Sequence, residues 1–163
     1  MLIGVFSDVH DHLDNLESVL VAFADRGIKD LLFLGDFCSP IPARRIGSYD
    51  GTVHCVFGNG DGDRFAMRSL PHEEFPALTL HGEHAELTLS NRRIAMTHYP
   101  FYGKALARTG DYDAVFSGHT HEPHVESFGA TLWANPGEVL GWKGAPSYGV
   151  YHPDKNEIEI HQV

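Results

Sequence analysis

The stretch Leu2-Ile3-Gly4-Val5-Phe6-Ser7-Asp8-Val9-His10 is a short apolar run that ends on an aspartate and a histidine. A short apolar run bounded by polar residues is typical of a buried strand. Asp8 and His10 lie two residues apart just past the end of this strand, so both side chains can point at one ion. The same pairing of an apolar run with a metal-binding side chain recurs along the chain, and this repetition decides the fold.

Four further apolar runs are each followed, within a few residues, by a side chain that can bind a metal. They are Leu31–Leu34 before Gly35-Asp36, Val53–Phe57 before Gly58-Asn59, Ile94–Met96 before Thr97-His98, and Ala114–Phe116 before Ser117-Gly118-His119-Thr120-His121. Because ligands in open α/β sheets gather outside the carboxyl ends of the strands, we expect these side chains at one edge of a sheet. The predicted metal ligands are Asp8, His10, Asp36, Asn59, His98, His119 and His121.

Each of these fragments alone has an ordinary explanation. Gly35-Asp36 and Gly58-Asn59 are common turn sequences, and a lone Asp-Val-His is more often a turn than a pair of ligands. Gly118-His119-Thr120-His121 is the most specific fragment, because packing does not explain two histidines within four residues after a buried strand. The occurrence of all five fragments, each at a strand end, favours a metal site over a set of turns.

The predicted ligand set mixes oxygen and imidazole donors, which argues against a calcium or magnesium cage and against a thiolate zinc site. It suits two divalent transition-metal ions, with Mn²⁺ as the first expectation and Ni²⁺, Fe, Co²⁺ or Zn²⁺ as alternatives. Two such ions roughly 3.5–4 Å apart share a bridging water, lower its pKa and hold the attacking and leaving oxygens of a phosphoryl group. Ions of this kind also let an acidic protein attract an anionic phosphoester.

Composition limits the class of protein. The 163 residues suit a single domain over residues 1–163, and 42% hydrophobic residues suit a soluble globular chain. The formal net charge of −10 disfavours nucleic acid as the main partner, because nucleic-acid binding normally needs a basic face. We find no apolar stretch long enough for a membrane span, no basic leader before Leu2 and no disulfide framework around Cys38 and Cys55. These features predict a cytoplasmic protein.

The expected elements alternate between helix and strand in the first half and are mostly strands in the second. Helices are expected after Asp11 or His12 and up to Gly27, from Pro42 to Ile46, around Arg64–Leu70, and over Lys104–Thr109. Besides the five apolar runs, strands are expected over Ala77–His81, Ala85–Leu89, Arg92–Thr97, His124–Phe128, Thr131–Ala134, Tyr148–His152 and Glu157–Gln162, with Ser90-Asn91 as a tight turn. This order predicts an α/β fold, a four-layer αββα sandwich of two mixed β-sheets flanked by helices.

At these residues the chain resembles the calcineurin-like metallophosphoesterases, whose motifs run D-x-H, G-D, G-N-x-[DE], H and G-H-x-H. Within that superfamily it is similar to the small YfcE-type phosphodiesterases in Ser7–Leu13, Gly58–Arg64 and Asn135-Pro136-Gly137-Glu138. The resemblance implies the four-layer sandwich and hydrolysis of a phosphoester by a hydroxide that bridges two metal ions. It assigns Asp8, His10 and His121 to one ion, Asn59, His98 and His119 to the other, and Asp36 to both.

The chain departs from the family pattern at two positions. Many members have a histidine after the motif asparagine that serves as a leaving-group acid, and here that residue is Gly60. Loss of such an acid costs about 10²–10⁴-fold, which predicts slow turnover of alkyl monoesters and a preference for good leaving groups such as aryl or nucleotide diesters. Asp61 and Asp63 are weak candidates for a substitute acid, although a role in shaping the loop is the better expectation for both. Tyr99 stands where the family commonly has glycine.

The remaining expectations concern substrate and partners. Arg64 and His12 are candidate substrate contacts, and the expected partner is a small phosphoester. The main alternative function is a protein-interaction scaffold of the same fold, as in the retromer subunit, and a nuclease is the weakest of the three. The complete set of seven metal-ligand candidates favours a metal-dependent phosphodiesterase, and a homo-oligomer is compatible with either function.

Overall fold

The computed structural model describes residues 1–163, which form two β-sheets and four helices. The six-stranded sheet has the order β11 (Glu157–Gln162), β10 (Ser147–His152), β1 (Ile3–Phe6), β2 (Asp30–Phe33), β3 (Thr52–Cys55) and β4 (Leu78–Leu80). The five-stranded sheet has the order β5 (His84–Leu89), β6 (Arg92–Thr97), β7 (Ala114–Phe116), β9 (Thr131–Asn135) and β8 (His124–Phe128). The helices are α1 (Leu13–Asp25), α2 (Pro40–Gly47), α3 (Arg64–Glu73) and α4 (Pro100–Thr109).

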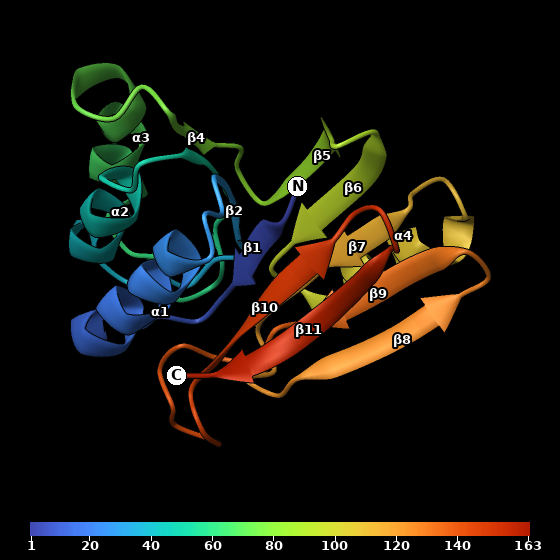
Figure 1. Cartoon of the computed structure of the whole chain (residues 1–163). Helices are drawn as coiled ribbons and strands as arrows, with labels where there is room; N and C mark the ends of the chain where they lie inside the picture. The colour runs from blue at the N-terminus through green and yellow to red at the C-terminus, as the bar shows by residue number, and fades with distance from the viewer.

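The elements stack in four layers that enclose three apolar cores. Helices α1, α2 and α3 lie together on the outer side of the six-stranded sheet, and α4 lies behind the five-stranded sheet (Figure 1). Side chains alternate across each strand, so Phe6 packs under the three helices while its neighbour Val5 packs between the two sheets. The third core joins Ala107 of α4 to Trp133 of β9. The predicted αββα sandwich is therefore confirmed.

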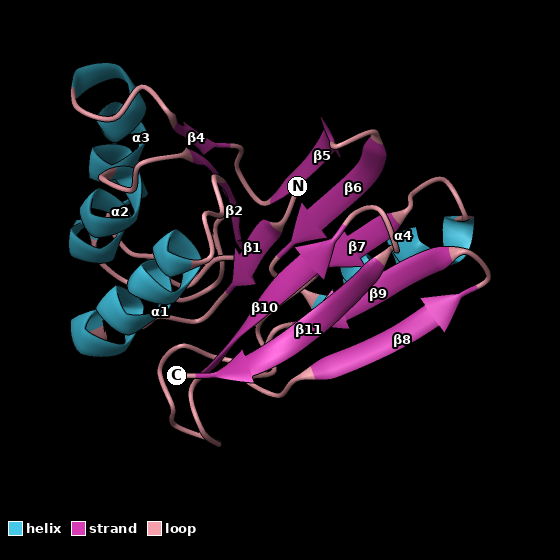
Figure 2. Ribbon diagram, viewed as in Figure 1, coloured by secondary structure: helices cyan, strands magenta, loops and turns pink.

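Both sheets are mixed, and their parallel strands carry the loops that matter for the site. Strands β1 to β4 are parallel, and β10 and β11 continue the sheet antiparallel on the other side of β1 (Figure 2). In the other sheet β6, β7 and β9 are parallel, with β5 and β8 as antiparallel edges. Because parallel strands end at the same edge of their sheet, the segments that follow them lie close together.

Several predicted boundaries are confirmed and others are wrong. Helix α1 is capped by the His12 side chain, which accepts a hydrogen bond from the amide of Asn15. Ser90 and Asn91 form the turn between β5 and β6 in left-handed conformations. Helices α2 and α4 begin at Pro40 and Pro100 rather than at Pro42 and Lys104, since proline is well suited to the first turn of a helix.

Helix α3 also extends beyond its predicted end. It runs to Glu73 rather than to Leu70 and contains Pro71 in its last turn. None of the four helices combines the length and apolar composition needed to cross a membrane.

Candidate metal centre

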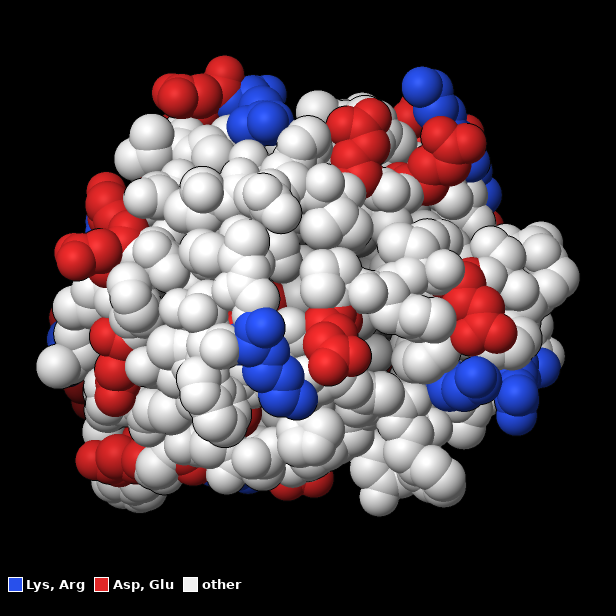
Figure 3. Space-filling model, turned by 90° about the horizontal axis from the view of Figure 1, so that it is seen from below, with Lys and Arg blue, Asp and Glu red and all other residues white.

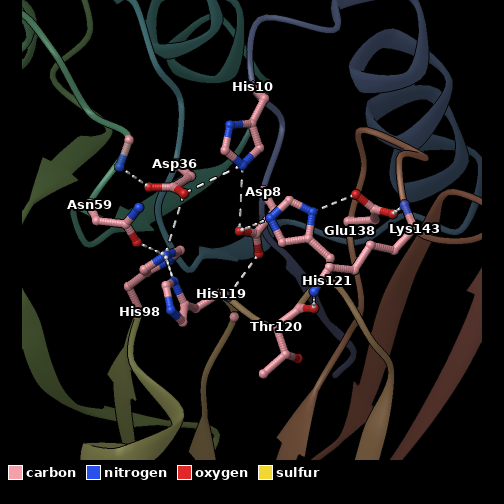
Figure 4. A network of polar contacts seen from close by, with 12 residues as sticks. Asp8, His10, Asp36, Asn59, His98, His119, Thr120, His121, Glu138 and Lys143 are labelled. Carbon is pink, nitrogen blue, oxygen red and sulfur yellow. Dashed lines mark hydrogen bonds and ion pairs between the residues drawn. The ribbon is translucent and has the colours of Figure 1, made fainter.

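The seven predicted metal ligands converge at one edge of the molecule, where the two sheets meet (Figure 4). The segments after β1, β2 and β3 bring Asp8, His10, Asp36 and Asn59 from the six-stranded sheet. The segments after β6 and β7 bring His98, His119 and His121 from the five-stranded sheet. The close-up shows these side chains pointing toward one another from both sheets (Figure 4).

One group of donors surrounds the carboxylate of Asp8, which is fully buried. His121 Nε2 lies 3.4 Å and His10 Nε2 lies 3.8 Å from Asp8 Oδ1. These three donor atoms lie within 4.8 Å of one another, a spacing that one ion can span. The Asp8 carboxylate is fixed by the backbone amide of His119, which donates to Asp8 Oδ2 at 3.0 Å.

A second group of donors surrounds His98, which is also fully buried. His98 Nε2 lies 3.4 Å from Asp36 Oδ2, 3.2 Å from Asn59 Oδ1 and 3.2 Å from His119 Nδ1. Asp36 Oδ2 also lies 3.4 Å from His10 Nε2, so this oxygen stands between the two groups. The other oxygen of Asp36 accepts a hydrogen bond from the amide of Gly60 at 2.6 Å.

The hydrogen bonds at the back of the site leave lone pairs directed at its centre. His98 Nδ1–H donates to the Leu34 carbonyl at 2.8 Å and His121 Nδ1–H donates to Glu138 Oε2 at 2.6 Å, which assigns the lone pair of each ring to Nε2. Asp8 Oδ1 and His10 Nε2 are buried and have no hydrogen-bond partner. Acceptors that face one another without a proton between them need a cation, so the donors present fit divalent metal ions.

The carboxylates favour positive charge at this edge. The carboxylate of Asp8, 3.8 Å from His10 Nε2, and that of Asp36, 3.4 Å away, raise the pKa of His10. Burial lowers the pKa of His98, but the neighbouring Asp36 and Asp8 carboxylates together outweigh this effect, so the pKa of His98 is raised overall. A proton on an imidazole or a bound cation supplies the positive charge that both carboxylates favour.

The backbone at the site adopts conformations that L-residues rarely use. Five of the seven candidates have positive φ angles between 44° and 71°, namely Asp8, His10, Asp36, His119 and His121. Such conformations cost free energy and persist where the surrounding structure enforces them. Glycine before His119 is required for a steric reason, because a Cβ at Gly118 would overlap Ser7 and lie 2.8 Å from Asp8 Oδ2.

The structure gives the two candidate acids supporting contacts. Asp61 is buried, and its carboxylate accepts hydrogen bonds from the amides of Asp36, Cys38 and Gly58 at 2.7–3.2 Å. Burial raises the pKa of Asp61. Asp63 caps α3 by accepting from the amide of Ala66 at 2.9 Å. Asp61 therefore joins the loops after β2 and β3, and Asp63 begins the next helix, as the loop-shaping expectation predicts.

The two candidate substrate contacts, His12 and Arg64, are both engaged by other protein groups. The His12 ring is half-buried and is used by the cap of α1. The Arg64 guanidinium donates to the Gly58 carbonyl, lies 3.3 Å from Glu83 Oε1 and lies over the Phe57 ring at 5.2 Å. Arg64 is thus held next to the loop that carries Asn59.

Glu138 is a part of the site that the sequence reasoning did not assign. It is buried, and it receives hydrogen bonds from His121 Nδ1–H at 2.6 Å and from the amides of Lys143 and Gly144. Burial raises the pKa of Glu138, but the hydrogen bonds from His121 and from the backbone amides together outweigh burial, so this pKa is lowered overall. In the sequence, Glu138 stands out only as part of Asn135-Pro136-Gly137-Glu138, a motif of the resembling subgroup.

Comparison with known proteins identifies the arrangement. The chain is 28% identical over 160 residues to Phosphodiesterase MJ0936 from Methanocaldococcus jannaschii, a match that covers 96% of each chain. Among solved structures, one described as a novel archaeal phosphodiesterase matches with a TM-score of 0.92, 26% identity and complete coverage of both chains. YfcE, a phosphoesterase from E. coli, matches with a TM-score of 0.71, 25% identity and complete coverage of both chains.

More distant structures share the fold alone. Vps29 from Chaetomium thermophilum matches with a TM-score of 0.71 at 15% identity, covering 100% of this chain and 97% of that one. The calcineurin-like phosphoesterase superfamily domain matches residues 1–156, nearly the whole sequence. With seven metal-ligand candidates gathered where its two sheets meet, the chain belongs to the calcineurin-like phosphoesterase superfamily, a metal-dependent family.

Proposed function

We propose that this protein is a metal-dependent phosphodiesterase that hydrolyses a small phosphoester. One observation carries the proposal: buried Asp8 Oδ1 and His10 Nε2 have no hydrogen-bond partner and face the donors of five other loop residues. The similarity to Phosphodiesterase MJ0936 over 96% of both chains supports the same activity.

We assign two ions to this site. Asp8, His10 and His121 would hold one, Asn59, His98 and His119 would hold the other, and Asp36 would contact both through the oxygen that lies 3.4 Å from His10 and from His98. When bound, two such ions lower the pKa of water and place positive charge against phosphoryl oxygens. Imidazole and carboxylate donors suit Mn²⁺ first, with Ni²⁺, Fe, Co²⁺ and Zn²⁺ as alternatives.

The surrounding residues position these donors but supply no evident leaving-group acid. Gly60 brings its amide, rather than a side chain, against Asp36, and a Cβ at residue 60 would lie 3.1 Å from Asp36 Cγ. Asp61 and Asp63 are engaged by backbone amides. We therefore expect substrates whose leaving group departs without a proton, such as aryl or nucleotide diesters, over alkyl monoesters.

The charge of the molecule favours a small substrate over a polynucleotide. The formal net charge is −10. Seen from below, lysine and arginine form separate spots among acidic residues rather than a continuous basic surface (Figure 3). Because nucleic-acid binding depends on many phosphate contacts, this distribution supports recognition of a single phosphoester at the metal edge. We place such an enzyme in the cytoplasm.

The test is a metal-reconstitution assay. Chelator-treated protein would be given Mn²⁺, Ni²⁺, Zn²⁺ or Mg²⁺ and assayed on bis(p-nitrophenyl) phosphate and on p-nitrophenyl phosphate, beside Asp36→Asn and Asp30→Asn. Asp30 is the first residue of β2, whereas Asp36 lies in the loop after this strand, at the metal edge. We expect metal-dependent turnover, a loss of more than about 100-fold in Asp36→Asn, and near-normal activity in Asp30→Asn.

The outcomes separate the two candidate functions. Metal-dependent turnover that Asp36→Asn abolishes supports the phosphodiesterase. Metal binding with no turnover of either ester would instead favour the scaffold function, which the shared fold with Vps29 makes the second candidate. Absence of metal binding would contradict the assignment of both ions.

A further inference from the structure

A pocket of about 350 Å³ lies next to the candidate metal centre, between the β5–β6 hairpin and α4. Its lining comes from the hairpin side through Glu83, His84 and Thr97, and from α4 and its N-cap through Tyr99, Tyr102, Ala105 and Leu106. None of these residues is among the seven metal-ligand candidates. A pocket of this volume holds an aromatic ring with a small substituent.

The Tyr99 ring is a shared wall between this pocket and the metal centre. Its centroid lies 5.2 Å from the His98 ring, 5.6 Å from the His119 ring and 6.0 Å from the Tyr102 ring. His98 and His119 belong to the group of donors that surrounds Asn59. A phosphate held at that group would therefore place one of its ester groups against Tyr99, at the entrance of the pocket.

The lining of the pocket selects the chemistry of that ester group. Two tyrosine rings and the side chains of Ala105 and Leu106 make most of its surface apolar. Aromatic rings at centroid distances of 4.5–7 Å gain interaction energy beyond the burial of apolar area, so the pocket favours a flat ring over an alkyl group. Glu83 and His84 supply polar groups on the hairpin side, where the Glu83 carboxylate lies 3.3 Å from Arg64.

We propose that this pocket binds an aromatic ester group of the substrate, with Tyr99 and Tyr102 as specificity-determining residues. The inference rests on the proposed function, because it needs a phosphoester bound at the metal edge. It narrows that function to phosphodiesters with at least one aryl or nucleobase-bearing ester group. Exposed Phe65, at the start of α3, lies outside the pocket and serves as the matched control.

Binding of two inert phosphonates tests the pocket without catalysis. Mn²⁺-loaded protein would be titrated calorimetrically with phenylphosphonate and with methylphosphonate, which share the anionic group and differ in the ring. We expect phenylphosphonate to bind about five- to tenfold more tightly. Tyr102→Ala, which removes one wall, and Ala105→Trp, which fills the pocket, should both abolish this preference and leave methylphosphonate affinity unchanged. Phe65→Ala should keep the preference.

Kinetics on bis(p-nitrophenyl) phosphate separate failure of the pocket from failure of the proposed function. We expect Tyr102→Ala and Ala105→Trp to raise KM about five- to tenfold with little change in kcat, and Phe65→Ala to change neither. Equal affinities for the two phosphonates in an active wild-type enzyme would contradict the proposed role of the pocket but would be compatible with the phosphodiesterase function. If the protein prefers phenylphosphonate but turns over no ester, the result would support aromatic binding in the pocket and would contradict the phosphodiesterase function.

Discussion

Glu138 is the residue on which the orientation of His121 depends. Its carboxylate is buried, accepts from His121 Nδ1–H at 2.6 Å and is itself held by the amides of Lys143 and Gly144. Partners of this kind fix the tautomer of a metal-binding histidine, and their loss typically costs about 10–100-fold in metal affinity. We predict that Glu138→Gln weakens Mn²⁺ binding about tenfold and Glu138→Ala about 100-fold, as measured by calorimetry.

A neighbouring acidic residue provides the control for this prediction. Glu122 is exposed and lies next to His121 in sequence, but its carboxylate forms no hydrogen bond or ion pair with a metal-ligand candidate. Glu122→Gln should therefore leave Mn²⁺ affinity unchanged. Equal affinities in Glu138→Ala and the wild type would show that His121 is oriented without this contact.

The seven ligand candidates and Glu138 differ in how far the sequence reveals them. Each ligand candidate follows an apolar run closely, so local sequence and the geometry of parallel strands suffice to bring it to the edge. Glu138 follows β9 and reaches His121 across 17 residues through a contact that exists only in the folded chain. No local periodicity encodes that contact, and only the resemblance in residues 135–138 pointed to the segment.

Among the secondary-structure elements, α3 begins after Asp63, and a variant of this residue can show whether it acts as a helix cap or as a catalytic acid. Asp63 accepts a hydrogen bond from the amide of Ala66 at 2.9 Å and is otherwise exposed. We predict that Asp63→Ala lowers the free energy of unfolding by about 1 kcal/mol without changing kcat, because loss of an N-cap costs about that amount. Urea denaturation and turnover of bis(p-nitrophenyl) phosphate measure the two effects.

Asp63→Asn makes the distinction sharper. Asparagine caps a helix about as well as aspartate but cannot donate a carboxylic proton. If Asp63 acts only as a helix cap, this variant should keep the stability and the kcat of the wild type. A large fall in kcat with unchanged stability would instead assign Asp63 as the leaving-group acid.

A pair of histidines links β3 to the segment after β4 and makes stability depend on pH. His54 Nδ1 lies 3.0 Å from His81 Nε2. Burial lowers the pKa of His54, and burial together with His54 lowers the pKa of His81. The unfolded chain, with a histidine pKa near 6.5, therefore takes up protons at a higher pH than the native state. The contribution of the pair to stability is complete above about pH 6.5 and is lost as the pH falls below it.

The lowered pKa values of this pair predict a measurable change of the free energy of unfolding with pH. We predict that, between pH 7 and pH 5, the free energy of unfolding of the metal-free wild type falls relative to that of the His54→Gln/His81→Gln double variant, because only the wild type carries the two lowered pKa values. Urea denaturation at a series of pH values measures both slopes. His72→Gln/His84→Gln, which changes two exposed histidines, should keep the wild-type slope. Parallel slopes in the wild type and the His54/His81 variant would contradict the prediction.

At the scale of the whole molecule, the metal centre joins the two sheets. Asp8 and Asp36 follow strands of one sheet, and His98 and His121 follow strands of the other. An ion held by both sides binds the native state and not the unfolded chain. We predict that Mn²⁺ at 100 times its Kd stabilises the protein by about 2.7 kcal/mol, which corresponds to roughly 5–10 °C in Tm.

Scanning calorimetry with chelator and with Mn²⁺ measures this shift. Asp36→Asn should reduce it strongly, because Asp36 Oδ2 lies between the two groups of donors. Asp30→Asn, at the start of β2, should keep it. The same increase in Tm in all three proteins would place the stabilising ion elsewhere on the molecule.

The global topology could be predicted only in part. Alternation of helices and strands followed by a strand-rich half predicted two sheets with flanking helices, and the structure confirms it. The sequence did not reveal which strands are neighbours. Tyr148, Val150 and Tyr151 are as buried as residues of a central strand, yet nothing local indicates that they belong beside β1. Register across about 145 residues is set by packing in the folded chain rather than by any pattern within one segment.

The position of β1 has a consequence for how the chain is made. β1 is synthesised long before β10, which is one of its two neighbours in the sheet, with Ile3 opposite Tyr151. Until residues 147–152 have been synthesised, β1 presents an open edge of unpaired amides and carbonyls. Sheets closed by such distant pairings fold slowly, and their unfinished edges invite association with other chains. Completion of the six-stranded sheet therefore waits for the synthesis of β10, and a ribosome stalled before β10 would hold a nascent chain prone to aggregation.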